Sequence, residues 1–221
     1  MVTLPSFLVD VPRTPAIAVG VPVALGFIPG LVTRNSIDSW YDTLKKPVGE
    51  PPRAAFPIVW TALYAGMGYA SHLLVKALDT SPRLAVRENA KTALTLHYAQ
   101  LALNLVWSPL FFSAHQVELA LVDILTLTGT VIGLTTVAAK VDERTLYAYV
   151  PYSLWLGYAS YLNAGIWYKN GGKENVQRLL NSAEDKARQA EKKAKEFGRE
   201  AESKGKEVKR DAEAKKDEKT Q

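Results

Sequence analysis

The chain has 221 residues, a formal net charge of +5 and no cysteine, which excludes disulfides, thiolate metal sites and a thiol nucleophile. Its charge is unevenly spread. Residues 171–221 carry 15 basic and 12 acidic side chains, more than half of the total, and residues 1–170 are strongly apolar. This division predicts a membrane core with a charged appendage, and the interleaved opposite charges argue against a nucleic-acid partner.

Residues 1–15 form an N-terminal segment that does not resemble a signal peptide, because its first basic residue, Arg13, follows the apolar stretch and prolines interrupt it. Five apolar segments follow within residues 16–170, each near the roughly 20 residues that a helix needs to cross a hydrocarbon core. The expected spans are residues 16–32, 56–78, 93–112, 119–139 and 146–167. The predicted fold class is therefore an all-α membrane protein, a five-transmembrane-helix bundle.

The connection between the first two spans is the longest, at about 23 residues, and it runs through "KKPVGEPPRAAFPIVW". Its prolines fix φ and remove backbone donors, so the loop is expected to be stiff, with Lys45, Lys46 and Arg53 at headgroup level. Pro57 falls in the first turn of the next span, where a missing N–H is tolerated. The last two connections, "SAHQVE" and "KVDERT", are short and predict antiparallel neighbours. Basic residues are divided almost equally between the two sides, so they do not fix the orientation.

Polar and aromatic side chains share one face of the third span. Gln100, Asn104, Trp107 and Phe111 follow one another at helical spacing. Two carboxamides and a tryptophan do not favour lipid, so this face is expected to point into the bundle or a cavity. Two interpretations of Asn104 stay open, hydrogen bonding between helices and lining of a ligand pocket, and both can hold together.

Two further faces are aromatic. On the last span these are Trp155, Tyr158, Ala159 and Leu162, and on the second Trp60, Tyr64 and Met67. Trp60 lies near the start of its span, where a belt at the membrane surface is an alternative explanation. Trp155 is deeper. A small Ala159 among large rings fits either the floor of a pocket for a flat apolar ligand or close helix packing.

Asp123 is the one acidic residue well inside an apolar segment, where a carboxylate is costly and indicates function, although a position one turn from the helix start also lets it reach water. Two small-residue patterns serve either the fold or a homodimer. They are Gly129-x-x-x-Gly133 and Ala62, Gly66 and Ala70. The three histidines are scattered and no catalytic motif is present, so no metal site is expected and the histidines are interpreted as structural.

Residues 171–221 are expected to form a charged cytosolic tail, helical or disordered. A heptad-like seam runs along it, made of Ala183, Ala187, Ala190, Ala194, Phe197, Ala201 and Val208. The seam is mostly alanine. It is read as a solvated helix, with a helix that binds a protein partner or the membrane surface as the alternative.

Three segments resemble a known family. The sequence "WYDTLKKPVGEPPRAAFPIVWTALYAGMGYASH", followed by "QLALNLVWSPLFF" and "VPYSLWLGYASYLN", is similar in order and spacing to the translocator protein family (TspO/MBR), also called the peripheral-type benzodiazepine receptor or tryptophan-rich sensory protein family. The resemblance covers about residues 20–170. It implies a five-helix membrane bundle, often a homodimer, with a pocket for porphyrins, benzodiazepine-type ligands and, in animals, cholesterol.

The resemblance also implies site residues, and a long first loop that closes over the pocket. The ligand-binding positions that match are Phe56, Pro57, Val59, Trp60, Asn104, Trp107, Leu119, Val122, Trp155, Ala159 and Leu162. Trp60 and Trp155 match the tryptophans tied to light-dependent porphyrin breakdown in bacterial members, so they are the candidate redox residues.

The chain departs from the family pattern at three places. Val48 and Gly49 stand where the loop usually has an aromatic residue, which suggests a weaker grip on a ligand. Ala164 and Gly165 stand where the sterol-recognition pattern needs an aromatic residue, which ranks sterols below tetrapyrroles. Leu119 occupies the position of a common pocket tryptophan.

The sequence thus predicts an integral membrane binding protein or transporter for tetrapyrroles, and secondarily for sterols or lipids. The alternatives are a porphyrin-degrading enzyme and a membrane scaffold that acts through its tail. No cofactor is expected beyond porphyrin as a ligand. The expected partners are the lipid bilayer, a second copy of the chain and a protein that binds the tail. The mitochondrial outer membrane is the favoured location, with the endoplasmic reticulum as an alternative.

Overall fold

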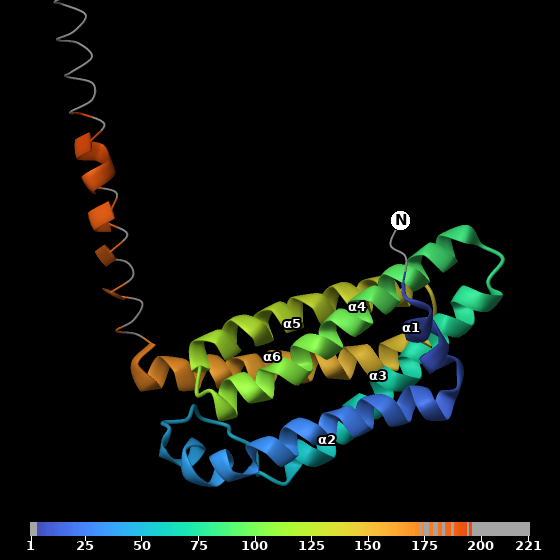
Figure 1. Ribbon diagram of the computed structural model, residues 1–221, viewed down its shortest axis with the longest axis horizontal. Coiled ribbons are helices and arrows are strands. Elements are labelled where there is room, and N and C mark those ends of the chain that lie inside the picture. Colours follow the sequence, from blue (N-terminus) through green and yellow to red (C-terminus); the bar gives the residue numbers. More distant parts are fainter. Residues whose placement is uncertain are drawn as a thin grey trace, which may run out of the picture. The chain divides into compact units, whose positions relative to one another are not determined.

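The computed structural model describes residues 4–172 and, beyond them, residues 174, 177–178, 181–182, 184–186, 188–193 and 195, with the side chains of residues 30–39 left out. The chain divides into two units, Met1–Asn170 and Gly171–Gln221. All regular structure in the described residues is helical. The helices of the first unit are α1 (Ser6–Asp10), α2 (Pro15–Ser39), α3 (Ala55–Thr80), α4 (Leu84–Ser108), α5 (Val117–Ala139) and α6 (Leu146–Trp167) (Figure 1).

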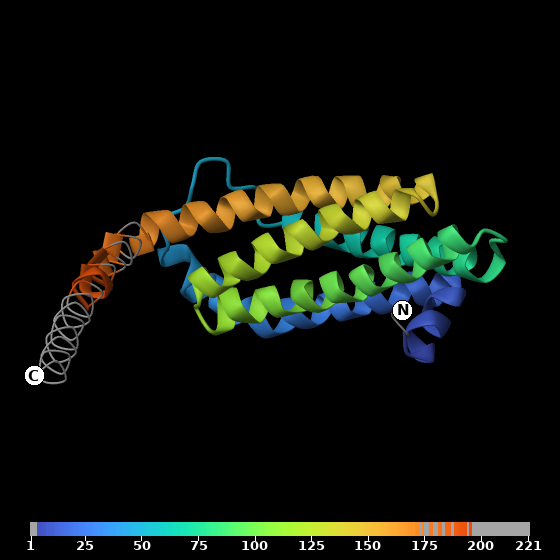
Figure 2. The same cartoon turned by 90° about the horizontal axis from the view of Figure 1, so that it is seen from above.

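The five long helices of this unit form a bundle. α2 packs along α3, α3 also contacts α4 and α6, and α5 lies between α4 and α6 (Figures 1 and 2). The main core is made of apolar side chains from α3 to α6, with Leu74, Leu94, Leu134 and Leu156 fully buried. The all-α class predicted from the sequence is confirmed for the described residues.

The observed helix limits differ from the predicted spans at two places. α4 begins at Leu84, nine residues before the predicted start, because the charged turns that precede the apolar segment are also helical. It ends at Ser108, and Pro109–Ser113 continues as a π-helical turn. α2 runs on to Ser39, seven residues past the predicted end, so the connection to α3 is shorter than expected. Hydropathy marks the apolar part of a helix and not its ends.

Length and composition identify only some of these helices as membrane spans. α3 and α5 are apolar and long enough to cross a membrane. A third candidate is a broken span made of Ser6–Arg13 and Pro15–Pro29, with a bend of 110° between the two parts. α4 and α6 have 25 and 22 residues, enough for a bilayer. Length therefore allows each of the five long helices to be one of the expected spans. Composition supports two or three of them as spans.

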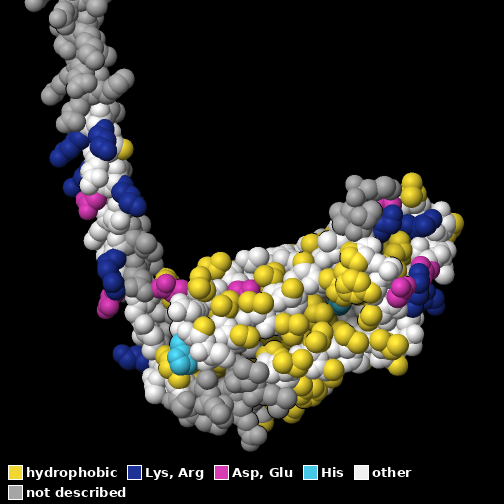
Figure 3. Space-filling model, viewed as in Figure 1, with side chains coloured by type: hydrophobic (Ala, Val, Ile, Leu, Met, Phe, Trp, Pro, Cys, Tyr) yellow, Lys and Arg dark blue, Asp and Glu magenta, His cyan; other side chains and the backbone are white. Residues whose placement is uncertain are grey.

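The outer surface fits a lipid environment. Ile58, Val122, Leu125, Ile132 and Leu154 are all more than half exposed. Figure 3 shows hydrophobic side chains across the middle of one face of the bundle, with charged side chains gathered at the end near the α3–α4 loop. Threonines within α5 are tolerated because their hydroxyls donate to carbonyls one turn earlier, as Thr126 does to Val122 (2.8 Å) and Thr130 to Thr126 (2.8 Å).

The two small-residue patterns have different surroundings. A Cβ on Gly66 would lie 3.4 Å from that of Ala148, and one on Gly68 would lie 2.2 Å from the Ala18 carbonyl oxygen. Glycines on α3 therefore allow α6 and α2 to approach closely. A Cβ on Gly129 or Gly133 would meet nothing within 4 Å. The glycines of α3 thus lie at helix contacts inside the fold, whereas Gly129 and Gly133 of α5 lie on a ridge with no described atom within 4 Å of their Cβ positions.

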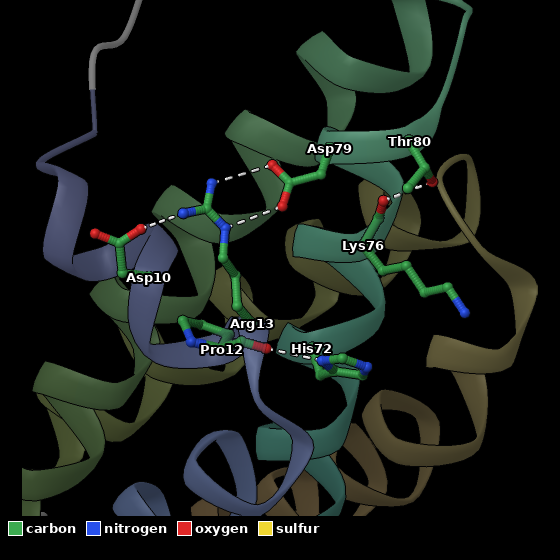
Figure 4. A network of polar contacts seen from close by, with 7 residues as sticks. All are labelled: Asp10, Pro12, Arg13, His72, Lys76, Asp79 and Thr80. Atoms are coloured by element: carbon green, nitrogen blue, oxygen red, sulfur yellow. Dashed lines mark hydrogen bonds and ion pairs between the residues drawn. The ribbon is translucent and has the colours of Figure 1, made fainter.

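The N-terminal segment is bound across the end of α3. Arg13 donates from Nε to Asp79 (3.0 Å) and from Nη2 to the other carboxylate oxygen (3.3 Å), and it also pairs with Asp10 (Figure 4). The Pro12 carbonyl is 2.8 Å from His72 Nδ1. These contacts hold the sharp bend before α2, and they give His72 the structural role predicted for it.

The described residues of the second unit are 171–172, 174, 177–178, 181–182, 184–186, 188–193 and 195, and all of them are helical. Lys195 pairs with Glu191 at 2.6 Å, one turn away. Six of the seven residues of the predicted alanine-rich seam, all but Ala190, lie outside the described residues, so that seam remains a prediction.

The close approach of α2 to α3 generates a test of the packing. Gly68→Ala forces a methyl group against backbone atoms that cannot rotate away, so it is expected to destabilise the protein by roughly 1–3 kcal/mol. The readout is the thermal unfolding midpoint in detergent micelles. Gly157→Ala on α6 is the matched control, and it should be neutral or slightly stabilising because its Cβ meets open space. Equal midpoints for the two variants would contradict the close α2–α3 contact.

Candidate ligand cavity and its lid

A cavity of about 420 Å³ lies inside the bundle. Each of the five long helices contributes to its wall, together with the π-helical turn Pro109–Ser113 and two residues of the α2–α3 loop, Tyr41 and Arg53. The lining is mostly aromatic and aliphatic, with a few amides and hydroxyls. A volume of this size is within the roughly 300–1,000 Å³ typical of small-molecule sites.

Most of the residues predicted as ligand-binding line this cavity. They are Phe56, Pro57, Trp60, Asn104, Trp107, Trp155, Ala159 and Leu162. Three do not. Val59 is absent from the wall, and Leu119 and Val122 lie on the outer side of α5 with 54% and 62% of their surface exposed. α5 contributes Ile124 and Leu127 instead. The positions taken from the resemblance on α5 therefore lie on the outer face of this helix, away from the cavity.

The sequence interpretation also missed the contribution of α2. Val23, Gly26, Phe27 and Pro29 line the cavity. A Cβ on Gly26 would lie 2.2 Å from the Tyr64 ring, so glycine lets α2 lie against that tyrosine. The glycines and prolines that made this span look weak were the available signal, since small residues mark places where two elements meet closely.

A hydrogen-bond network includes two residues of the cavity wall, Tyr64 and Asn104. Tyr64 donates to the Asn104 carboxamide oxygen, and the Asn104 amide donates to Tyr152 (2.8 Å). Tyr152 in turn donates to Gln100 (2.8 Å). This network joins α3, α4 and α6. Asn104 therefore both connects the helices and lines the cavity, and the two interpretations of this residue hold together.

Trp107 and Asn163 form a second polar pair on the wall. The Trp107 indole donates to the Asn163 oxygen (3.0 Å), and the Asn163 amide donates to the Val117 carbonyl at the start of α5 (3.1 Å). Their polar atoms are thus used within the protein, and what they present to the cavity is largely ring and methylene surface.

The aromatic wall contains a tryptophan pair. The rings of Trp60 and Trp155 meet edge to face, with centroids 6.4 Å apart, and Phe56 lies against Trp155 at 6.1 Å. Trp155 Nε1 is buried and has no hydrogen-bond partner among the described residues. A buried donor without a partner is unusual in a native structure. Trp155 is one of the residues that line the cavity, so the unpaired donor belongs to a side chain of the cavity wall.

Asp123 Oδ2 is the other buried polar atom of the described residues that has no partner. Asp123 is only 9% exposed, so the alternative that it reaches water finds little support. It does not line the cavity. The structure therefore separates this carboxylate from the ligand-binding positions.

Side chains of α6 and the residues that follow it bind the segment Lys45–Gly49 of the α2–α3 loop. Tyr158 donates to the Gly49 carbonyl (2.5 Å), and Tyr161 donates to the Val48 carbonyl (3.0 Å). Asn170 exchanges two bonds with the Lys45 backbone, accepting from its N–H at 3.0 Å and donating to its carbonyl at 2.9 Å. We call this segment the lid.

The lid explains two departures from the family pattern. Pro47 packs on Gly165, where a Cβ would lie 2.7 Å from the proline ring, so Gly165 is required for docking of the lid. Val48 is 85% exposed, and neither it nor Gly49 lines the cavity. Gly49 has a φ of +92°, a conformation that favours glycine. The sequence predicted a weaker grip on a ligand at these two positions. In the structure both residues contact α6 through their backbone carbonyls.

Ion pairs surround the cavity residues of the loop. Arg53 pairs with Asp42, and Lys46 pairs with Glu50 (3.1 Å). The Arg53 guanidinium lowers the pKa of Asp42 through a hydrogen bond and its charge. A lowered carboxyl pKa stabilises the fold above the ordinary value of about 3.9, and this contribution is lost as the pH falls below it. Burial raises the pKa of Tyr41, which keeps the hydroxyl protonated as it donates to Glu50 (3.0 Å).

The attachment of the lid can be tested by hydrogen exchange. A Tyr158→Phe, Tyr161→Phe double variant removes two lid bonds, each worth about 1 kcal/mol, so amide exchange over residues 45–50 is expected to rise by at least about tenfold. Tyr147→Phe is the control, because this tyrosine is 86% exposed and does not contact the lid. Lid exchange that is the same in both variants would show that α6 does not hold the lid.

Comparisons with known proteins agree with this architecture. Residues 18–168 match the TspO/MBR family. The translocator protein of Ovis aries is 38% identical over 160 residues, which cover 72% of this chain and 91% of the relative. The translocator protein homolog of Schizosaccharomyces pombe is 40% identical over 145 residues (66% and 85%). The tryptophan-rich protein TspO of Chlorobaculum tepidum is 35% identical over 157 residues (71% and 96%). These matches confirm the resemblance found in the sequence, and the chain belongs to the TspO/MBR family of membrane proteins.

Proposed function

We propose that this protein binds tetrapyrroles such as protoporphyrin IX in the bundle cavity and carries them within or across a membrane. The observation that supports this most is the wall itself, a largely apolar space of about 420 Å³ with two tryptophans and a phenylalanine along one side. Flat aromatic ligands are held by such rings, and a few fixed polar groups orient them. Relatives named translocator protein agree with a transport role.

Two polar groups fit the chemistry of a porphyrin. The Trp155 N–H offers a donor that no described side chain uses. Arg53 lines the mouth of the cavity with its charge maintained beside Asp42. Guanidinium groups bind carboxylates with charge-assisted hydrogen bonds, so Arg53 is the partner we assign to the porphyrin propionates.

The binding test is a dark fluorescence titration of the purified protein with protoporphyrin IX. Saturable quenching is expected, and Trp155→Phe should weaken binding by about tenfold through loss of one hydrogen bond. Trp167→Phe is the control, since this indole donates to Glu118 and does not line the cavity. Absence of saturable quenching at micromolar porphyrin would overturn the proposal.

The role of Arg53 is separated from general packing by changing the ligand. Arg53→Gln is expected to weaken binding of the free diacid by at least about tenfold and to leave binding of the dimethyl ester unchanged, because the ester has no carboxylate. Lys45→Gln, an exposed lid cation that does not line the cavity, is the control. Equal losses for diacid and ester would remove Arg53 from the site.

A second function, light-dependent porphyrin degradation, is favoured by the contact between Trp60 and Trp155. Both rings line the cavity, where they are close enough to a bound porphyrin to quench its excited state or to donate an electron. Illumination of the complex should then consume porphyrin. The Trp60→Phe, Trp155→Phe double variant should stop this loss, provided that it is compared at saturating porphyrin. If the porphyrin absorbance of the wild-type complex stays constant under light, the protein binds porphyrin without degrading it.

The remaining assignments are proposals of the same kind. Sterols or lipids are a second ligand class for the apolar walls, tested by displacement of bound porphyrin with cholesterol. The open ridge at Gly129 and Gly133 is the face we assign to a homodimer. The mitochondrial outer membrane is the proposed location, tested by fractionation of a tagged copy. A scaffold role of the charged tail is tested by truncation after Gly171.

A further inference from the structure

A second cavity, of about 290 Å³, lies on the outside of the bundle between α3 and α6. It is lined by Gly66, Tyr69, Ala70, Arg144, Tyr147 and Ala148, and it shares no residue with the tetrapyrrole cavity. We call it the α3–α6 groove. Nothing in the proposed tetrapyrrole binding uses it.

The shape of the groove follows from its small floor. Gly66 and Ala148 bring the two helices close together, since a Cβ on the glycine would lie 3.4 Å from the alanine Cβ. Tyr69 and Tyr147 stand on either side of this floor and are 49% and 86% exposed. Such exposure means that the tyrosine rings contribute little to the packing of the bundle. A narrow apolar channel between two rings suits one extended acyl chain.

Charge at the mouth of the groove selects the headgroup. Arg144 donates to Asp142 from Nε (3.0 Å) and Nη2 (2.6 Å), a pair that fixes the guanidinium next to Tyr147. Lys76 lies seven residues after Tyr69 on α3, which places it on the same face of that helix, about two turns nearer its end. Lys76 makes no ion pair with a described residue, and Figure 4 shows its ammonium directed away from Asp79. Arg144 is thus held in an ion pair with Asp142, next to Glu143 in the chain, and Lys76 is the second cation of this group.

The end of the bundle at which Arg144 and Lys76 lie carries a net positive charge. Among the described residues it carries seven cations and five carboxylates, an excess of positive charge. The cations are Arg13, Lys76, Arg83, Arg87, Lys91, Lys140 and Arg144, and the carboxylates are Asp10, Asp79, Glu88, Asp142 and Glu143. Basic residues at the ends of membrane helices attract anionic lipids, and tyrosines are enriched at the same depth.

We propose that the α3–α6 groove binds an anionic phospholipid of the surrounding bilayer. One acyl chain lies on the floor of Gly66, Ala70 and Ala148, between the two tyrosine rings. The phosphate lies at Arg144 and Lys76, and the tyrosine hydroxyls are at the level of the ester carbonyls. The site is independent of the proposed tetrapyrrole binding, because the two cavities have no residue in common.

The test uses the full chain in detergent micelles with dioleoyl phosphatidylglycerol, and dioleoyl phosphatidylcholine as the neutral competitor. Native mass spectrometry is expected to show one phosphatidylglycerol retained in preference to phosphatidylcholine. Lys76→Gln and Arg144→Gln should each weaken retention by about fivefold, the effect of one basic residue near an anionic headgroup. Tyr147→Ala should also weaken retention, and it is a safe variant for folding because the side chain is 86% exposed.

Arg87→Gln is the matched control, because it removes one exposed cation from the same end of the bundle without touching the groove. It should leave retention unchanged. Equal retention of the two lipids by wild type would overturn the proposal. So would a loss in Arg87→Gln as large as that in Arg144→Gln, which would mean that charge attracts lipid diffusely. Unchanged retention by Tyr147→Ala would show that the chain does not lie in the groove.

Discussion

Inside a bilayer a buried polar group has no water to bond, so it must find its partner within the protein. The network from Tyr64 through Asn104 and Tyr152 to Gln100 meets this constraint for α3, α4 and α6. Sliding one helix along another would leave at least one of these groups unpaired, at a cost of about 1–3 kcal/mol. The network therefore fixes the register of the three helices. The bundle cavity depends on that register, because the same helices contribute to its walls.

The exceptions to this rule are informative because they are few. Among the side-chain atoms of the described residues, only Trp155 Nε1 and Asp123 Oδ2 are buried without a partner. Trp155 is a residue of the cavity wall and contacts Trp60. Asp123 lies outside the cavity. Residues of the α2–α3 loop differ in the same way. Two of its backbone carbonyls accept hydrogen bonds from Tyr158 and Tyr161, whereas the side chain of Arg53 lines the cavity.

The two ends of the bundle are built for different tasks. At one end the lid is attached to α6 and to Asn170, and Tyr41 and Arg53 of the same loop line the cavity. At the other end, ion pairs such as that of Arg13 with Asp79 hold the N-terminal segment across α3, and Arg144 lines the α3–α6 groove. The proposed ligands follow this division, with a flat ring system inside the bundle and a bilayer lipid on its outer surface.

The sequence by itself determined the helices and the faces of α3, α4 and α6. Trp60 with Tyr64, and Asn104 with Trp107, share a face wherever their helices lie, because residues three or four apart are neighbours on any helix. It did not determine which side of α5 faces inward. Apolar residues occur on every side of that helix, and lipid is as apolar as a neighbouring helix, so hydropathy cannot distinguish Leu119 from Ile124. Only the tertiary structure decided this orientation, the contribution of α2, and the attachment of the lid to residues more than 100 positions away.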